Sequence, residues 1–174
     1  MSQRRRRISD EILDTWAAGV SYLIRVTVIQ LGTLVEKYGN TIPPGFENAG
    51  EDALLEAGLL HLRAIDDFFG PRPEGRPDGR PRDVNASDWV KWQGEIWLDP
   101  AVRSLINWKI AHLTSVSGVE YQWRLANLGA AVCRQFEKFM AQVEKECPDR
   151  EPAFEQNARE VVRHFQSVFD QHRS

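Results

Sequence analysis

The feature that most constrains the fold is a long apolar stretch near the start of the chain. Residues 16–35 (WAAGVSYLIRVTVIQLGTLV) carry a single charge, Arg25, and follow the basic run Arg4 to Arg7. A stretch of this length and composition either crosses a membrane or forms the central helix of a core. Arg25 would lie near the middle of a bilayer, at a cost of about 2.5–3.5 kcal/mol. Acidic residues interrupt the approach to the stretch, and no cleavage site of small residues follows it. We therefore expect a core helix and no association with a membrane.

Apolar residues at intervals of three and four predict five helices. The expected ranges in chain order are 9–38, 51–69, 100–113, 117–147 and 153 onward. Gly39 is expected to end the first helix, and the capping box Ser117-Gly-Val-Glu120 is expected to begin the fourth. No alternating pattern typical of strands and no long internal repeat is present. The sequence therefore predicts an all-α fold, a bundle of four to five helices that forms one domain over residues 9–174, after a basic tail over residues 1–8.

The apolar stripes of the first and last helices predict which of their side chains are buried. In the first helix, the inward stripe is expected to contain Ile12, Trp16, Val20, Leu23, Thr27, Leu31, Leu34 and Tyr38, widened by Ile24, Val28 and Val35. In the last helix, the expected inward residues are Phe154, Ala158, Val161, Phe165 and Val168. The first stripe is unusually broad, so we expect that helix to be covered on several sides.

A segment without periodicity separates the second and third helices. Residues 70–82 (GPRPEGRPDGRPR) are rich in proline, glycine and arginine, and they contain an imperfect EGRP/DGRP repeat. Such a composition cannot pack as a helix or strand and is typical of a flexible loop. We expect this loop to cover residues 70–88, with a short helix after Ser87.

The charge and cysteine content exclude several kinds of site. The formal net charge of −3 gives no general attraction to nucleic acid or to an anionic membrane. Cys133 and Cys147 are isolated and have no Cys/His spacing typical of a metal site. No phosphate-binding glycine loop or dinucleotide fingerprint is present. We therefore expect neither a metal nor a cofactor, and two isolated thiols favour a cytoplasmic location.

Arg63, Asp67 and His112 are candidate catalytic residues. Arg63 and Asp67 lie four residues apart on one face of the second helix, and His112 lies near the end of the third. If these helices are neighbours, the carboxylate can hold a charged imidazole while Arg63 binds a phosphate or carboxylate. The alternative is a helix-surface ion pair beside a structural histidine that caps carbonyl groups. The sequence leaves both interpretations open.

The same residues belong to a longer pattern. Leu62-Arg63-x-x-x-Asp67-Phe68-Phe69, followed by Ala111-His112-Leu113-Thr114, resembles a group of small uncharacterised bacterial all-helical proteins. These proteins are similar in turn to HEPN-type helical bundles, many of which are ribonucleases of toxin–antitoxin or defence systems. Such nucleases place an arginine and a histidine four to six residues apart on a late helix, and Arg159 and His164 have this spacing. The residue that follows the arginine is usually polar, and here it is the acidic Glu160. The resemblance implies RNA binding or cleavage by Arg159 and His164.

Four of the six tryptophans lie within residues 89–108, beside the arginine-rich loop. As candidate ligand-binding residues, Trp89, Trp92 and Trp108 could stack on bases or line an apolar pocket. Alternatively, the indoles close the end of the bundle where the long loop crosses it. Both interpretations follow from an aromatic cluster next to a segment that cannot itself pack.

The broad apolar surface of the first helix gives the main functional expectation. A helix that is apolar on several sides favours association with another protein surface. We expect a helical protein-association or regulatory module that forms a homodimer and that acts by protein association, either with itself or with a protein partner. The alternatives are a HEPN-like RNA-binding or RNA-cleaving protein, and a helical protein that binds a small ligand beside Arg63, Asp67 and His112.

Overall fold

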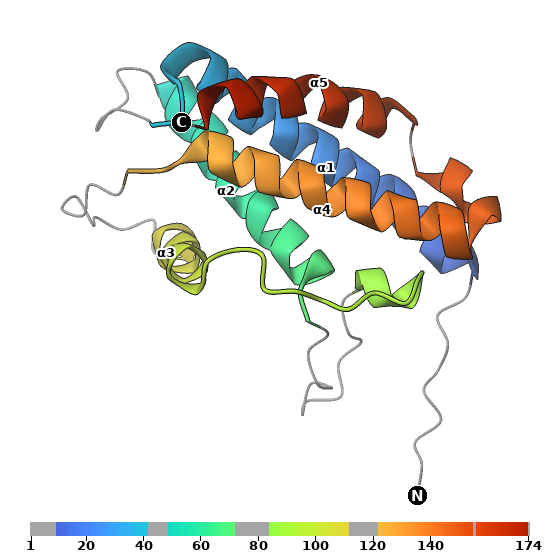
Figure 1. Cartoon of the computed structure of the whole chain (residues 1–174). Helices are drawn as coiled ribbons and strands as arrows, with labels where there is room; N and C mark the ends of the chain where they lie inside the picture. Colours follow the sequence, from blue (N-terminus) through green and yellow to red (C-terminus); the bar gives the residue numbers. More distant parts are fainter. Residues whose placement is uncertain (1–9, 42–48, 72–83, 112–121, 155, 174) are drawn as a thin grey trace, which may run out of the picture.

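The computed structural model describes residues 10–41, 49–71, 84–111, 122–154 and 156–173 (Figure 1). Within these ranges the chain forms helices and no strand, so the predicted all-α fold is confirmed. The α-helices are α1 (Asp10–Tyr38), α2 (Ala49–Phe69), α3 (Pro100–Ala111), α4 (Leu125–Glu146) and α5 (Gln156–His172). Two short 3₁₀ helices are η1 (Ala86–Asp88) and η2 (Pro148–Ala153). The basic tail and most of the predicted flexible loop, residues 72–83, lie outside the described ranges.

Helix α1 is the centre of the bundle. It packs against α2, α4 and α5, and Figure 1 shows α4 running antiparallel to α1 while α5 runs parallel to it. In the described part of the chain, α1 alone is long and apolar enough to cross a membrane, and the core helix of a soluble protein meets the same criteria. Its fully buried side chains are those expected of a core helix, and they include Ile24, Val28, Leu31, Leu34 and Val35.

The predicted inward stripe of α1 is wrong in its first two turns. Ile12 and Trp16 are 49% and 50% exposed, and Leu13 and Ala17 are buried instead. Each pair lies at helical spacing from the buried Val20, so either pair could extend the apolar stripe in these turns. The sequence alone does not decide which pair faces the core. The neighbouring helices cover one pair and leave the other in solvent.

Helix α4 begins later than its predicted start at the Ser117–Glu120 capping box. It starts at Leu125, and residues 117–120 lie outside the described ranges. Asn40 supplies the cap instead: its backbone carbonyl accepts from the Leu125 N–H (2.9 Å) and its side-chain Oδ1 from the Ala126 N–H (3.0 Å). Arg124, the residue just before the helix, pairs with Thr41 in an isolated antiparallel β-bridge.

Helix α5 fits between α1 and α4 because glycines accept two of its phenylalanines. A Cβ atom at Gly32 of α1 would lie 2.1 Å from the ring of Phe165, and one at Gly129 of α4 would lie 2.3 Å from the ring of Phe169. The predicted inward residues of the last helix, from Phe154 to Val168, all lie in the core or pack against it, and Val162 and Phe169 are buried beside them. The buried residues of the helix are Ala158, Val162 and Phe169, while Val161, Phe165 and Val168 are partly buried against the core. Because α5 contacts α1 and α4 at once, its buried face is wider than the predicted stripe.

Candidate functional site

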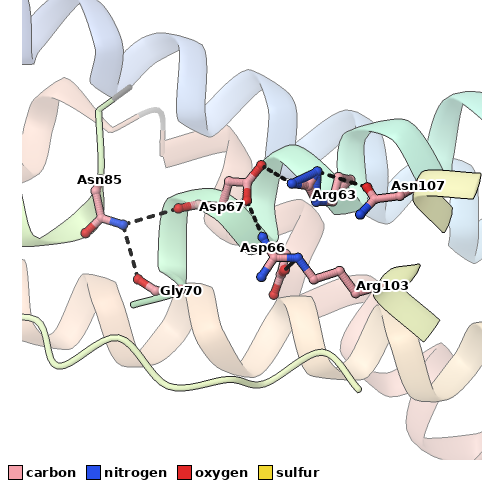
Figure 2. Close-up of polar contacts among 7 residues, drawn as sticks. All are labelled: Arg63, Asp66, Asp67, Gly70, Asn85, Arg103 and Asn107. Carbon is pink, nitrogen blue, oxygen red and sulfur yellow. Dashed lines mark hydrogen bonds and ion pairs between the residues drawn. The ribbon is translucent and has the colours of Figure 1, made fainter. Parts of the chain in front are cut away.

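A polar cluster joins α2 to α3 (Figure 2). Arg63 and Asp67 lie one turn apart on α2, and Arg103 and Asn107 lie one turn apart on α3, so each helix presents a pair of polar side chains to the other. Helix α3 reaches this position because Asp99 caps its start. The Asp99 Oδ1 accepts from the Ala101 N–H (2.7 Å), which fixes the first turn ahead of Arg103.

The charged groups of the cluster bind one another. Arg63 Nη2 lies 3.1 Å from Asp67 Oδ2, and Arg63 Nη1 donates to Asn107 Oδ1 at 3.1 Å. Arg103 bridges two carboxylates, with Nη2 2.5 Å from Asp67 Oδ1 and Nε 3.1 Å from Asp66 Oδ2. Two arginines therefore balance two aspartates, and the cluster has no net charge.

Asp66 is the buried member of the cluster. It is only 2% exposed, and burial raises the pKa of its carboxyl above the usual value, with the nearby charge of Asp67 acting in the same direction. The positive charges of Arg103 and Arg63 act in the opposite direction and lower that pKa. A buried carboxylate is stable only with a paired cation, so Asp66 and Arg103 form the central contact of the cluster.

The carboxyl end of α2 is closed by residues 84–92, and the first five of these are ordered although the sequence predicted a flexible loop up to residue 88. Asn85 is buried, and its Nδ2 donates to the carbonyls of Asp67 and Gly70, both at 3.2 Å. Trp92 Nε1 donates to the Phe69 carbonyl at 2.8 Å. These bonds satisfy carbonyl groups that the end of a helix leaves without partners. The polar cluster is thus held in place from its backbone as well as from its side chains.

The structure brings Arg63 and Asp67 together, as predicted, but His112 lies outside the described residues. Sequence reasoning missed Asp66, Arg103 and Asn107. The sequence does contain a sign that Asp66 is buried. Asp66 lies four residues after the buried Leu62 and three before the buried Phe69, so it falls on the same apolar face of the helix. An acidic residue in the register of a core stripe needs a cation on a facing helix, and that requirement points to α3.

Trp89 and Trp92 lie in an aromatic cluster at one end of the bundle. The Trp89 ring is 5.6 Å from that of Phe68 and 6.1 Å from that of Phe154, and the Trp92 ring is 5.8 Å from that of Phe139, centroid to centroid. Trp89 is buried and Trp92 is partly buried. This placement favours the interpretation that the indoles close the bundle. The side chain of Trp108 lies outside the described residues.

Arg159 and His164 occupy different sides of α5. Arg159 is bound by two carboxylates, with Nη2 2.6 Å from Glu144 Oε1 and Nη1 3.0 Å from Glu151 Oε1. His164 is exposed and contacts Phe165 edge-on. Side chains five residues apart on a helix point in directions that differ by about 140°. Arg159 and His164 therefore do not face a common site on α5. The ribonuclease assignment therefore stays a prediction.

One face of α1 is apolar and exposed. Ile12, Trp16, Tyr22 and Ile29 are each 40–54% exposed, and Leu60 of α2 is 48% exposed. At Gly19, within this face, no neighbouring atom of the described residues lies within 4 Å of the position that a Cβ would take. The Arg25 guanidinium lies over the Tyr22 ring, 5.8 Å from its centroid. Apart from Arg25, no charged residue occurs between residues 15 and 35.

Two further kinds of site lack support in the described part of the chain. No group of three His, Cys, Asp or Glu side chains there is placed to hold a metal ion. Cys133 is buried, and burial raises the pKa of its thiol to about 12, so it does not form a thiolate near neutral pH.

No protein-family model, no curated protein and no solved structure matches this chain. Function is therefore inferred from the chain's own residues.

Proposed function

We propose that this chain is a protein-association module that forms a homodimer through the exposed face of α1. The observation that carries the proposal is the distribution of exposed apolar side chains. Of the six large apolar side chains exposed in the described part of the chain, four lie on α1: Ile12, Trp16, Tyr22 and Ile29. Scattered apolar residues are ordinary on a protein surface, but several large ones exposed together on one helix are typical of an interaction site.

The polar groups favour association over catalysis. In the α2–α3 cluster, the two arginines form ion pairs with the two aspartates, and no net charge is left for a phosphate or carboxylate substrate. Arg159 is likewise engaged by Glu144 and Glu151. An RNA-binding surface needs cations that face the phosphates, and these arginines already have acidic partners.

The proposal is tested by light scattering across a range of protein concentrations. The wild-type mass should rise towards about 40 kDa, twice the chain mass of 19.9 kDa, between about 5 and 200 µM. Tyr22→Glu places a charge in the centre of the exposed face and should give a monomer throughout. Ile96→Glu is the matched control, because Ile96 is 68% exposed and belongs to the segment between η1 and α3 and not to α1. A wild-type protein that stays at 19.9 kDa over the whole range would refute the proposal.

A further inference from the structure

The exposed face of α1 repeats every seven residues. Two parallel rows, offset by three residues, run along it: Ile12, Gly19 and Val26 in one row and Thr15, Tyr22 and Ile29 in the other. This is the a/d spacing by which one helix packs against another in a coiled coil. The rows span about 26 Å, and the buried face of α1 lies on the other side of the helix.

We infer that this face binds α1 of a second copy of the chain, with the two helices antiparallel about a twofold axis. The inference rests on the self-association proposed above. In an antiparallel pair, each layer of the interface contains one residue from each chain, and the two residues come from different rows. The layers here place Ile12 opposite Ile29, Thr15 opposite Val26, and Gly19 opposite Tyr22. A twofold axis repeats every layer, so one set of contacts closes the dimer and leaves no surface for further growth.

The sizes of Gly19 and Tyr22 select the antiparallel orientation. Tyr22 is 54% exposed, and the position above Gly19 is open, so the tyrosine of each chain fills the space above the glycine of the other. A parallel pair would place Gly19 opposite Gly19 and Tyr22 opposite Tyr22. One layer would then contain a gap and the other would be overfilled, and both defects destabilise a packed interface.

The polar groups of this face are compatible with burial against a second copy. The Thr15 Oγ1 already donates to the Glu11 carbonyl at 2.9 Å, so covering the residue leaves no unsatisfied hydroxyl. Arg25 lies at one edge of the rows, where its guanidinium can stay in water. The two copies of Arg25 are offset by about nine residues, or about 13 Å along the helix, which exceeds the screening length of about 8 Å at physiological salt.

The area of the face indicates a weak dimer. Trp16 and Tyr22 are about half exposed, and an aromatic side chain buries about 150–250 Å² when fully covered. Together with the aliphatic residues of the rows, each chain would bury on the order of 500 Å², which gives about 1,000 Å² in total, the lower limit of a specific interface. We therefore expect a dissociation constant in the micromolar range, on the order of 1–100 µM.

Cross-linking through single introduced thiols tests the orientation. Thr15→Cys and Val26→Cys are each made in a Cys147→Ser background, which removes the partly exposed native thiol, while Cys133 is buried. In the antiparallel dimer, the thiol of the Thr15→Cys chain faces the thiol of the Val26→Cys chain. Two copies of the same variant instead hold their introduced thiols about 16 Å apart along the helix, too far for a disulfide. Oxidation of the two variants mixed at about 100 µM should give a covalent dimer, and either variant alone should give less than about a tenth as much.

The alternative outcomes are distinguishable. Efficient cross-linking of either variant alone would indicate a parallel pair and would overturn the inference, while the proposed dimer would stand. A dimer by light scattering with no cross-link in any sample would place the interface elsewhere and would also overturn it. A protein that remains monomeric and that instead binds vesicles of phosphatidylserine, with binding lost in Tyr22→Glu, would refute both the inference and the proposed dimer.

Discussion

Replacing Arg103 by methionine removes the cation from the contact between α2 and α3. Methionine keeps the length and much of the volume of the side chain, so the change tests charge more than packing. Asp66 would then be almost fully buried without its nearest cation, which lies 3.1 Å away in the native protein. Removing one partner of a buried ion pair costs about 3–5 kcal/mol, because the remaining charge is left uncompensated.

The expected loss for Arg103→Met is near the lower end of this range. Arg103 is itself about one-third exposed, and its second contact, with Asp67, lies at the surface and contributes about 0.2–1 kcal/mol. We therefore expect a loss of about 3 kcal/mol in the free energy of unfolding at pH 7. For a chain of this length, that loss lowers the melting temperature by about 6–12 °C.

The loss should depend on pH because Asp66 can take up a proton. The folded-state pKa of Asp66 is raised above its usual value of 3.8, so the folded protein binds a proton that the unfolded chain has released. The contribution of Asp66 to stability is therefore fully present below pH 3.8 and is lost as the pH rises through the folded-state pKa. Without Arg103 that pKa rises further, so the deficit of the variant should be smaller near pH 4 than at pH 7.

Urea unfolding monitored by circular dichroism at both pH values measures these differences. The control is the double variant Asp66→Asn/Arg103→Met, in which no charge is buried and most of the stability should return. A loss below about 1 kcal/mol for Arg103→Met, equal at pH 4 and pH 7, would refute the reasoning, because it would show that the pair behaves like a surface ion pair.

Two further predictions concern helix contacts. His61 of α2 bonds to Gln30 of α1 (Nδ1 to Oε1, 3.0 Å), and burial lowers the pKa of its imidazole. Its contribution to stability is present above about pH 6.5 and is lost as the pH falls through the folded-state pKa, so chemical unfolding between pH 7 and pH 5 should show a slope that His61→Gln reduces. Gly129→Ala would place a Cβ 2.3 Å from the buried Phe169 ring and should lower the free energy of unfolding by about 1–3 kcal/mol, whereas Gly19→Ala should not, because its Cβ meets open space within the chain; thermal unfolding of dilute, monomeric protein compares the two.

Helix ends with local signals could be predicted from the sequence. Gly39 ends α1 as expected, with a positive φ of 76° and its N–H bonded to the Val35 carbonyl at 2.8 Å. Asp99 and Pro100 likewise begin α3 where the sequence places it. In both cases the residues that decide the boundary lie within one turn of it, so a local pattern contains the necessary information.

Features that depend on distant partners could not be predicted. The start of α4 depends on Asn40, and the burial of Asp66 depends on Arg103 of another helix. The residues that form the exposed face of α1 could not be predicted for a related reason. Ile12 and Trp16 are as apolar as the residues that the core buries, so only the positions of α2, α4 and α5 decide which register faces solvent. The candidate site could be predicted only in part for the same reason. Arg63 and Asp67 were recognisable as a pair on one helix, but their partners on α3 are distant in the sequence and were not.

The cap that Asn40 provides for α4 links folding events far apart in the chain. Asn40 and Ala126 are separated by 86 positions, so the first turn of α4 gains its hydrogen-bond partners only after the end of α1 has docked beside it. Closing a loop of that length before any contact forms is slow compared with forming a helix. During synthesis, α1 leaves the ribosome well before α4 and has to wait for that helix with an apolar surface uncovered. This interval is when the chain is most exposed to aggregation, and when a chaperone or a second nascent copy would meet it.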